Sequence, residues 1–587
     1  MNPEDYEENS PSRTFRLPKT AEIEEAVRSF PLLEKTFFYF FAVLFVVSAL
    51  VLVWKVNEYF MVQVPASGGT ITEGVIGYPR YINPLLPITD SGRDLTDLIY
   101  SGLMKATPDG ALVPDLAKEY TISPDGLTYT FTLKDNVYFQ DGTPVTADDI
   151  EFTINKVKDP ELKSPEMANW SGVTVTKLND KQIQFTLTKP YAPFLQNTII
   201  GILPKHIWQN IDNDEFNFTN YNIEPIGSGP YKIESVKRDA EGLPEYYHLV
   251  PFAQYAGGKA YVSNIFVRFY TNEKDLVNAY SSGQVTSINS ISPDDAQALK
   301  SQGARIETTP LPRVFGAFFN QSNNPVLANH EVRDALNVAV DRQAMVSTIL
   351  DGYGSPIDGP LPPNALSGET GLRQAQLSDD DRIAAAKKIL TDAGWALNAQ
   401  GVMEKKTKTG DQTLSFSIST ANSADLSQAA SMLKDDWTKI GAQVTVKLFD
   451  VGDLNQNVIR TRKYDALLFG EIIGRDLDLF AFWDSSQRND PGLNIAEYAN
   501  STVDKLLEDA RTTSDADKQL DDYTKFEDAI YTDTPAVFLY SPDFIYVVPK
   551  NLQGLTLGDI TTPDERFLGV KSWYLDTDNV WKIFTKQ

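Results

Sequence analysis

The residues that most often perform catalysis or bind metals are scarce in this chain of 587 residues. It has no cysteine, which excludes disulfides, thiolate nucleophiles, zinc–thiolate sites and a lipid-modified cysteine. Its three histidines, His206, His248 and His330, are far apart and show no HExxH or paired spacing. The sequence therefore predicts no metal site and no cofactor.

One serine lies in a glycine-rich stretch that invites comparison with a nucleophile motif, Gly227-Ser228-Gly229-Pro230. The stretch does not match the GxSxG nucleophile elbow, and no histidine is near it in the sequence. The chain also has no GxxxxGK[ST] phosphate loop and no Ser-x-x-Lys with its partner motifs. We predict no catalytic residues and a protein that is not an enzyme.

The net charge of the chain limits the classes of partner that it can bind. The formal net charge is -26, whereas binding nucleic acid requires a dense basic surface. An acidic surface instead keeps an abundant protein soluble, and we expect a monomer that binds no nucleic acid.

The strongest shift in composition is near the start, at residues 37–54, FFYFFAVLFVVSALVLVW, which contain no charge and no proline. At a rise of 1.5 Å per residue this run spans about 27 Å, close to the roughly 30 Å of a hydrocarbon core. Lys35 and Lys55 flank it, and Tyr39, Trp54 and Tyr59 suit the two membrane interfaces. The sequence predicts a transmembrane helix over residues 37–55.

The distribution of basic residues on the two sides of this helix predicts its orientation in the membrane. Five lysines and arginines precede it, whereas only Lys55 and then Arg80 follow closely, which favours a cytoplasmic N-terminus and a large extracytoplasmic domain. A cleaved signal peptide is the alternative, since Val64-Pro65-Ala66 has small residues that a peptidase accepts. The apolar run is long and many polar residues precede it, so we favour an uncleaved anchor after a disordered tail over residues 1–36. A short amphipathic helix around residues 21–30 is the alternative within this tail.

The sequence of the large domain contains patterns typical of β-strands and patterns typical of α-helices. Polar and apolar residues alternate over residues 128–133 and 182–187, as in half-buried antiparallel strands. Ser378 is placed to cap a helix over residues 379–392, and strands alternate with helices through the C-terminal half. These patterns predict an α/β fold.

Residues 127–153 read LTYTFTLKDNVYFQDGTPVTADDIEFT, in which Asp141-Gly142 forms a turn and Thr146 caps a helix. This segment is the densest of several in register that resemble the extracellular solute-binding protein family 5, the oligopeptide- and dipeptide-binding proteins of ABC importers. Further similar segments follow in the family's order: residues 203–208, 225–231, 319–320, 332–336, 339–342, 385–395 and 494–507. The resemblance covers roughly residues 70–587.

The resemblance implies a two-lobed, type II periplasmic-binding-protein-like fold with an extra β-rich domain, here preceded by one transmembrane helix. Hinges would lie near Pro310-Leu311-Pro312 and Thr534-Pro535. The expected organisation is a cytoplasmic tail (1–36), the transmembrane helix (37–55), a linker (56–69), lobe one (70–110, 226–312 and 537–587), the extra domain (111–225) and lobe two (313–536).

The resemblance also indicates where a ligand would bind. In the family a segment after a strand of lobe two crosses the cleft, often with Gly-Trp and an aspartate that receives a peptide's α-ammonium; here it is residues 469–478. Glu471 stands in place of the tryptophan and Gly474 in place of the aspartate, and Asp476 or Asp478 substitutes only through a register shift. This departure leaves peptide as the ligand open. Glu471 and Arg475 either contact the ligand or form a surface ion pair.

The other candidates come from segments that match cleft-facing loops of the family. For each aromatic among them a place in the core remains an equal alternative. Aromatic walls with a few charged ends suit a peptide-like solute. The complete predicted ligand-binding set is Glu73, Tyr78, Arg313, Phe315, Glu471, Arg475, Asp476, Trp483 and Tyr540.

The function implied is capture of a peptide or peptide-like solute by lobe closure and its delivery to the permease subunits of an ABC importer. A peptide-binding chaperone or sensor with the same fold is the first alternative, and a hydrolase is the second. The membrane-anchored receptor is the leading hypothesis.

Overall fold

The protein is described here by a computed structural model, which describes residues 19–363, 365–366, 372–373, 377–408 and 410–585. The chain divides into two compact units. One consists of residues 1–66 with 577–587, and the other of residues 67–576.

The smaller unit contains the predicted membrane span. Its helix α2 (Leu32–Phe60) extends beyond the predicted 37–55 at both ends, because neither Glu34 nor the polar residues after Trp54 interrupt helical backbone. Among the described helices it alone is long and apolar enough to cross a membrane, and no part of its apolar stretch is buried against the rest of the protein. This exposure excludes a core helix.

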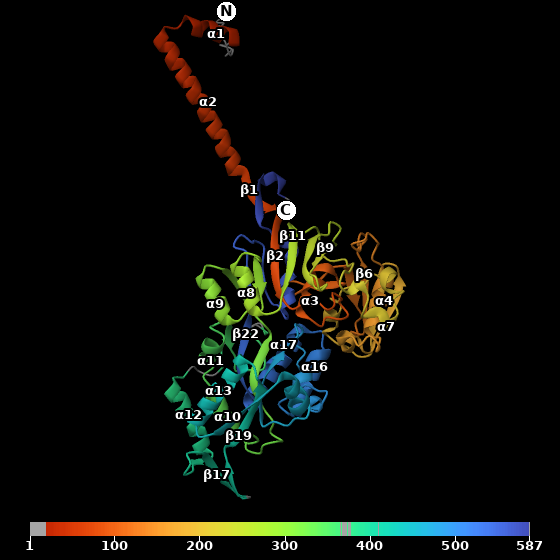
Figure 1. Cartoon of the computed structure of the whole chain (residues 1–587), viewed down its shortest axis with the longest axis vertical. Helices are drawn as coiled ribbons and strands as arrows, with labels where there is room; N and C mark the ends of the chain where they lie inside the picture. Colours follow the sequence, from red (N-terminus) through yellow and green to blue (C-terminus); the bar gives the residue numbers. More distant parts are fainter. Residues whose placement is uncertain (1–18, 364, 367–371, 374–376, 409, 586–587) are drawn as a thin grey trace, which may run out of the picture. The chain divides into compact units, whose positions relative to one another are not determined.

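Two predictions for the flanks of α2 differ from the structure. Within the tail predicted to be disordered, α1 (Thr20–Ser29) is helical, because Glu22 accepts the backbone N–H of Lys19; residues 1–18 lie outside those described. The predicted linker over residues 56–69 is ordered: α2 continues to Phe60 and is followed by β1 (Met61–Ala66). The strand β1 pairs with β23 (Asp576–Trp581) from the far end of the chain (Figure 1).

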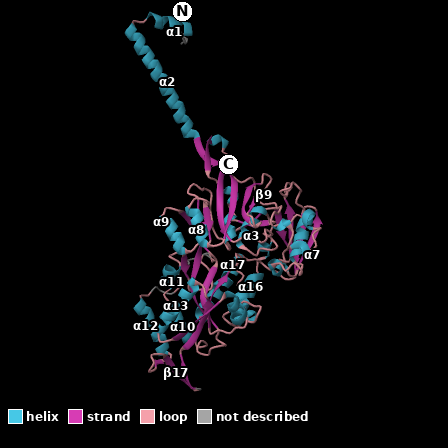
Figure 2. Ribbon diagram, in the orientation of Figure 1, coloured by secondary structure: helices cyan, strands magenta, loops and turns pink. Residues whose placement is uncertain are grey.

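The larger unit contains a long mixed sheet in the order β20-β19-β21-β14-β22-β12-β2-β11-β10-β9. Helices flank its strands (Figure 2). The part that corresponds to lobe one is built from β2 (Gly68–Ile76), β9 (Tyr231–Arg238), β10 (Pro244–Pro251), β11 (Val262–Tyr270), β12 (Ser287–Asn289) and β13 (Arg305–Pro310), with α3 (Asp90–Ile99), α8 (Glu273–Ser281) and α9 (Pro293–Ser301).

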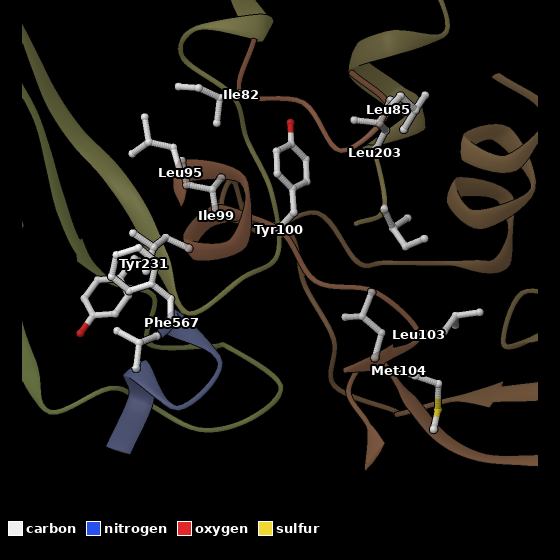
Figure 3. Close-up of a cluster of buried hydrophobic side chains, with 14 of the residues drawn as sticks. Ile82, Leu85, Leu95, Ile99, Tyr100, Leu103, Met104, Leu203, Tyr231 and Phe567 are labelled. Carbon is white, nitrogen blue, oxygen red and sulfur yellow. The ribbon is translucent and has the colours of Figure 1, made fainter. Parts of the chain in front are cut away.

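The core of lobe one joins distant parts of the sequence. Leu95 and Ile99 of α3 lie in one cluster with Tyr231 of β9, Leu203, and Phe567 of the C-terminal return (Figure 3). Each of these side chains is at most 4% exposed. The C-terminal residues therefore stabilise the same lobe as residues near the start of the domain.

The predicted alternating strands occur as β6 (Thr128–Leu133) and β8 (Gln182–Leu187), which pair with each other antiparallel. They form a separate sheet in the order β5-β6-β8-β7, with β5 (Ala117–Ile122) and β7 (Val173–Asn179). Beside it, α4 (Ala147–Val157) begins with the predicted cap: Thr146 donates through both its backbone N–H (2.8 Å) and its hydroxyl (2.9 Å) to Asp149.

Lobe two contains a second α/β layer. Its strands are β14 (Arg313–Phe319), β15 (Gly354–Pro356), β19 (Ser415–Ala421), β20 (Gln443–Phe449) and β21 (Ala466–Ile472), and its main helices are α10 (His330–Val338), α11 (Arg342–Ile349), α12 (Asp379–Asp392), α13 (Ala424–Lys439), α16 (Ser501–Thr512) and α17 (Ala516–Asp533). The alternation of strands and helices predicted for the C-terminal half is present.

The helix predicted to start after Ser378 matches α12, and the Ser378 hydroxyl accepts the backbone N–H of Asp381. We expect Ser378→Ala to lower the free energy of unfolding by about 1 kcal/mol, because an N–H of the first turn loses its acceptor. Ser423, at the start of α13, makes no such bond and is the matched control. Equal losses for the two variants in denaturant unfolding would contradict this.

Two chain segments connect the lobes. One is Leu311-Pro312, between β13 and β14, within the stretch for which the resemblance implies a hinge. The other is β22 (Ala536–Val548), which pairs with β14 and β15 up to Pro542 and with β13 from Asp543 onward. The sequence places this crossing at Thr534-Pro535 instead; there the left-handed Thr534 ends α17, and such a helix end resembles a hinge in sequence.

Candidate functional site

The strands that meet where the lobes join carry four of the predicted ligand-binding residues. Arg313 pairs with Ile472, Val314 with Glu471, and Phe315 with both Gly470 and Tyr540. We call residues 310–315, 470–478 and 540–543 the lobe junction. Paired residues of adjacent strands share a face, so Glu471 lies on the face of Val314, opposite to that of Arg313 and Phe315.

Glu471 is the most unusual group of the junction. Its side chain is buried, with 3% of the residue exposed, and neither carboxyl oxygen has a hydrogen-bond partner among the described residues. Burial raises the pKa of this carboxyl well above its usual value. A buried carboxyl without a partner is costly, and such a group is well suited to bind a cation or a hydrogen-bonding group that enters from outside.

Arg475 connects the two lobes. Its guanidinium lies 2.6 Å from the Glu565 carboxylate and donates at 2.8 Å to the backbone oxygen of Asp559. Both partners belong to the C-terminal return, and the charged side chains of this pair are only 7% and 9% exposed. The alternative of a surface ion pair between Glu471 and Arg475 is therefore wrong, because Arg475 is bound to Glu565.

The two aspartates of this segment differ. Asp478 accepts from Arg511 (2.8 Å) and from Tyr191 of the β-rich part (3.2 Å). Asp476 is half-buried, and burial is the largest cause that raises its pKa. Asp478 is thus bound by two side chains and helps to hold lobe two against the β-rich part, whereas Asp476 does not take part in these bonds.

On the other face of the strands, the rings of Phe315 and Tyr540 stack at 5.2 Å. The hydroxyl of buried Tyr540 and the Nε of half-buried Arg313 have no hydrogen-bond partner among the described residues. Burial also lowers the pKa of Arg313.

Three predicted residues lie elsewhere. Glu73 is fully buried and accepts from Arg566 (3.1 Å) and Tyr546 (2.9 Å). Trp483 is fully buried in the core of lobe two, and half-buried Tyr78 packs against Phe269 at 6.1 Å. Glu73 and Trp483 have structural roles in this conformation, and the assignment of the three as ligand contacts remains a prediction.

Asp97 and Asp564 form an acidic group near Glu565, the partner of Arg475. No pattern in the sequence predicts that these two residues lie together. Burial, followed by Asp94 and Glu565, raises the pKa of Asp564 to about 6. Burial and then the neighbouring carboxyl of Asp564 raise the pKa of Asp97 well above its usual value. Carboxyls that lie close enough to raise one another's pKa attract positive charge.

Other features of the described residues do not suggest a second site. They contain no group of three or more histidine, aspartate or glutamate side chains placed to hold a metal. A cavity of about 460 Å³ lies at the start of α11 and includes Asp341 and Arg382 in its lining. None of the nine predicted residues lines it.

Comparison with known proteins agrees with this architecture. The sequence profile of the bacterial extracellular solute-binding proteins, family 5 (middle region), matches residues 111–491. The oligopeptide-binding protein AppA of Bacillus subtilis is 27% identical over 87% of this chain and 92% of its own length. Protein XP55 of Streptomyces lividans is 30% identical over 82% of this chain and 86% of its own.

A solved structure is similar over most of the chain. The ABC transporter substrate-binding protein CtaP of Listeria monocytogenes has a TM-score of 0.72 and 27% identity, over 87% of this chain and 99% of that one. The predicted two-lobed, type II periplasmic-binding-protein-like fold is thereby confirmed. The chain belongs to family 5 of the bacterial extracellular solute-binding proteins.

Proposed function

We propose that this protein captures a peptide or peptide-like solute with a cationic group between its lobes and delivers it to an ABC import permease. The observation that carries the proposal is the buried, unpartnered carboxyl of Glu471 at the lobe junction. The names of two similar proteins support the class of solute and of transport: one is oligopeptide-binding, and the other is an ABC transporter substrate-binding protein.

The proposed mechanism is lobe closure. Arg475 reaches from lobe two to Glu565 and Asp559, and Asp478 contacts Tyr191, so these bonds belong to the closed state. A ligand drives closure only through contacts that it makes better in the closed state than in the open one. Glu471 and Asp476 on lobe two, with the Asp97–Asp564 pair on lobe one, supply such contacts from both sides to a cation.

The proposed location is the outer face of the cell membrane. The helix α2 passes once through the bilayer with its N-terminus in the cytoplasm, and residues 67–576 are extracytoplasmic. The length and all-round apolar surface of α2 and the excess of basic residues before it support this topology. The receptor then remains beside its permease as a monomer.

Native mass spectrometry of the full-length chain, purified in detergent, tests the proposal. We expect co-purified peptides of mixed sequence that carry a positive charge. One defined small molecule would contradict a general peptide receptor, and an uncharged ligand would contradict the role given to Glu471. Adding the released ligand back to stripped protein, with calorimetry, then gives the affinity.

Arg475→Ala is expected to weaken ligand binding roughly thirtyfold, because truncation of one partner in a desolvated ion pair costs about 2 kcal/mol or more and 1.4 kcal/mol is tenfold. Arg460→Ala is the matched control, since Arg460 pairs with Asp490 within lobe two and is exposed. Calorimetry measures both affinities. If the two variants bind equally well, Arg475 does not stabilise the closed state.

A further inference from the structure

The C-terminal segment contacts the end of the membrane helix. The strands β1 and β23 pair with each other beside the end of α2 (Figure 1), and Trp581 is the last residue of β23. The indole N–H of Trp581 donates to the side-chain oxygen of Asn57 at 2.8 Å, and its ring stacks on Phe60 at 6.1 Å between centroids. The strand pairing and the two contacts of Trp581 with α2 thus hold this segment beside the end of the helix.

Large apolar side chains are exposed at this point. Ile583 and Phe584, in the short helix η7 (Lys582–Phe584), are 78% and 74% exposed, and Tyr59 of α2 is 83% exposed. Single exposed apolar residues are ordinary on a protein surface. Here, however, they stand beside a helix whose own exposed residues are those expected to contact lipid.

Positions along the axis of α2 indicate how deep in the bilayer the contact between Trp581 and α2 would lie. With the apolar run ending at Trp54, Asn57 lies about 4.5 Å and Phe60 about 9 Å further along the helix axis. The polar layer on each side of a hydrocarbon core is roughly 5–8 Å thick. Asn57 is therefore at headgroup depth, and so is the indole of Trp581 that donates to it, in the layer where tryptophan is enriched.

We propose that residues 581–584 form a second membrane contact, with Ile583 and Phe584 inserted at the boundary between the headgroups and acyl chains of the bilayer. The occupant of this apolar surface is lipid. Lys582 lies between Trp581 and Ile583, where its ammonium reaches lipid phosphates while the apolar neighbours are buried. This inference rests on the proposed membrane location of α2.

The absence of cysteine allows a direct test in the full-length chain. Phe584→Cys and Ile583→Cys each provide one thiol for an environment-sensitive fluorophore, at positions too exposed to support the core. Val46→Cys, in the middle of α2, reports on the span itself. Leu397→Cys, a 57% exposed position in lobe two, is the control in water. All four proteins are reconstituted in phosphatidylcholine–phosphatidylglycerol vesicles with nitroxide-labelled lipids.

We expect the labels at positions 583 and 584 to shift to the blue and to be quenched more by nitroxides near the headgroup than by nitroxides at the chain end. The label at position 46 should show the reverse order, and the label at 397 no quenching. If 583 and 584 behave like 397 while 46 is quenched by deep nitroxides, the second contact is refuted and the anchor stands. If 46 is also unquenched, the anchor itself is refuted.

Discussion

Replacing Arg566 with alanine is expected to lower the free energy of unfolding by about 3–5 kcal/mol, the cost of leaving buried charges without their partner. The Arg566 side chain is fully buried, 2.6 Å from the Asp94 carboxylate and 3.0 Å from the Glu73 carboxylate. Both acids lie in lobe one, far from Arg566 in the sequence. Their mutual repulsion and desolvation would be uncompensated in the variant. Denaturant unfolding of the full-length protein measures the loss.

Arg460→Ala again serves as the control, because exposed ion pairs contribute about 0–1 kcal/mol. A loss for Arg566→Ala as small as that of Arg460→Ala would show that Glu73 and Asp94 do not depend on Arg566. Glu73→Gln separates the two roles considered for Glu73. As a structural residue it lowers stability with unchanged affinity, whereas as a ligand contact it lowers affinity.

The second large effect is expected at Glu471, where stability and function should change in opposite directions. Glu471→Met removes a buried carboxyl without partners and should raise the free energy of unfolding by about 1–3 kcal/mol. The same change should weaken binding of a cationic solute about tenfold to a hundredfold, because hydrogen bonds to charged groups contribute roughly 1.5–3 kcal/mol. Unfolding and calorimetry on the same preparation measure both.

Glu497→Met is the matched control for this variant. Glu497 is a glutamate of the same lobe whose carboxylate lies 3.0 Å from the Arg462 guanidinium, so its removal should destabilise the protein and leave binding unchanged. If Glu471→Met binds the solute as well as the wild type does, Glu471 is not a ligand contact. If it is also less stable, the carboxyl has a partner in solution.

The raised pKa of Glu471 also predicts a pH dependence. The folded protein holds this proton more tightly than the unfolded chain, so the contribution of Glu471 to stability is fully present below about pH 4. It is lost as the pH rises from there toward the raised pKa. Stability measured against pH should therefore differ little between wild type and Glu471→Gln in acid, and the variant should be the more stable at neutral pH.

Local patterns in the sequence predicted the elements that depend on neighbouring residues. The alternation in β6 and β8, the cap at Ser378 and the apolar run of α2 each express a physical requirement within a few positions. The pairing of β1 with β23 joins positions near the two ends of the chain, and neither strand has an alternating apolar face. For that reason the segment 56–69 resembled a linker.

For the candidate site too, the local segment was predictable from the sequence and its distant partners were not. The resemblance identified the segment that carries Glu471, Arg475 and Asp476, because its length and its place after β21 are family features. The partner of Arg475 was not predictable, since Glu565 is ninety residues away in the sequence. The burial of Glu73 depends on Arg566, which lies even further along the chain.

The pairing of β1 with β23 has a consequence for how the proposed membrane attachment could be lost. The chain leaves the smaller unit after Ala66 and returns to it at Thr577, so the larger unit is a loop whose two ends both connect to the smaller one. A protease that cuts one connection leaves the domain attached through the other. Under the proposed topology, a domain held by a single connection is released from the membrane by one cut, whereas release of this one requires two.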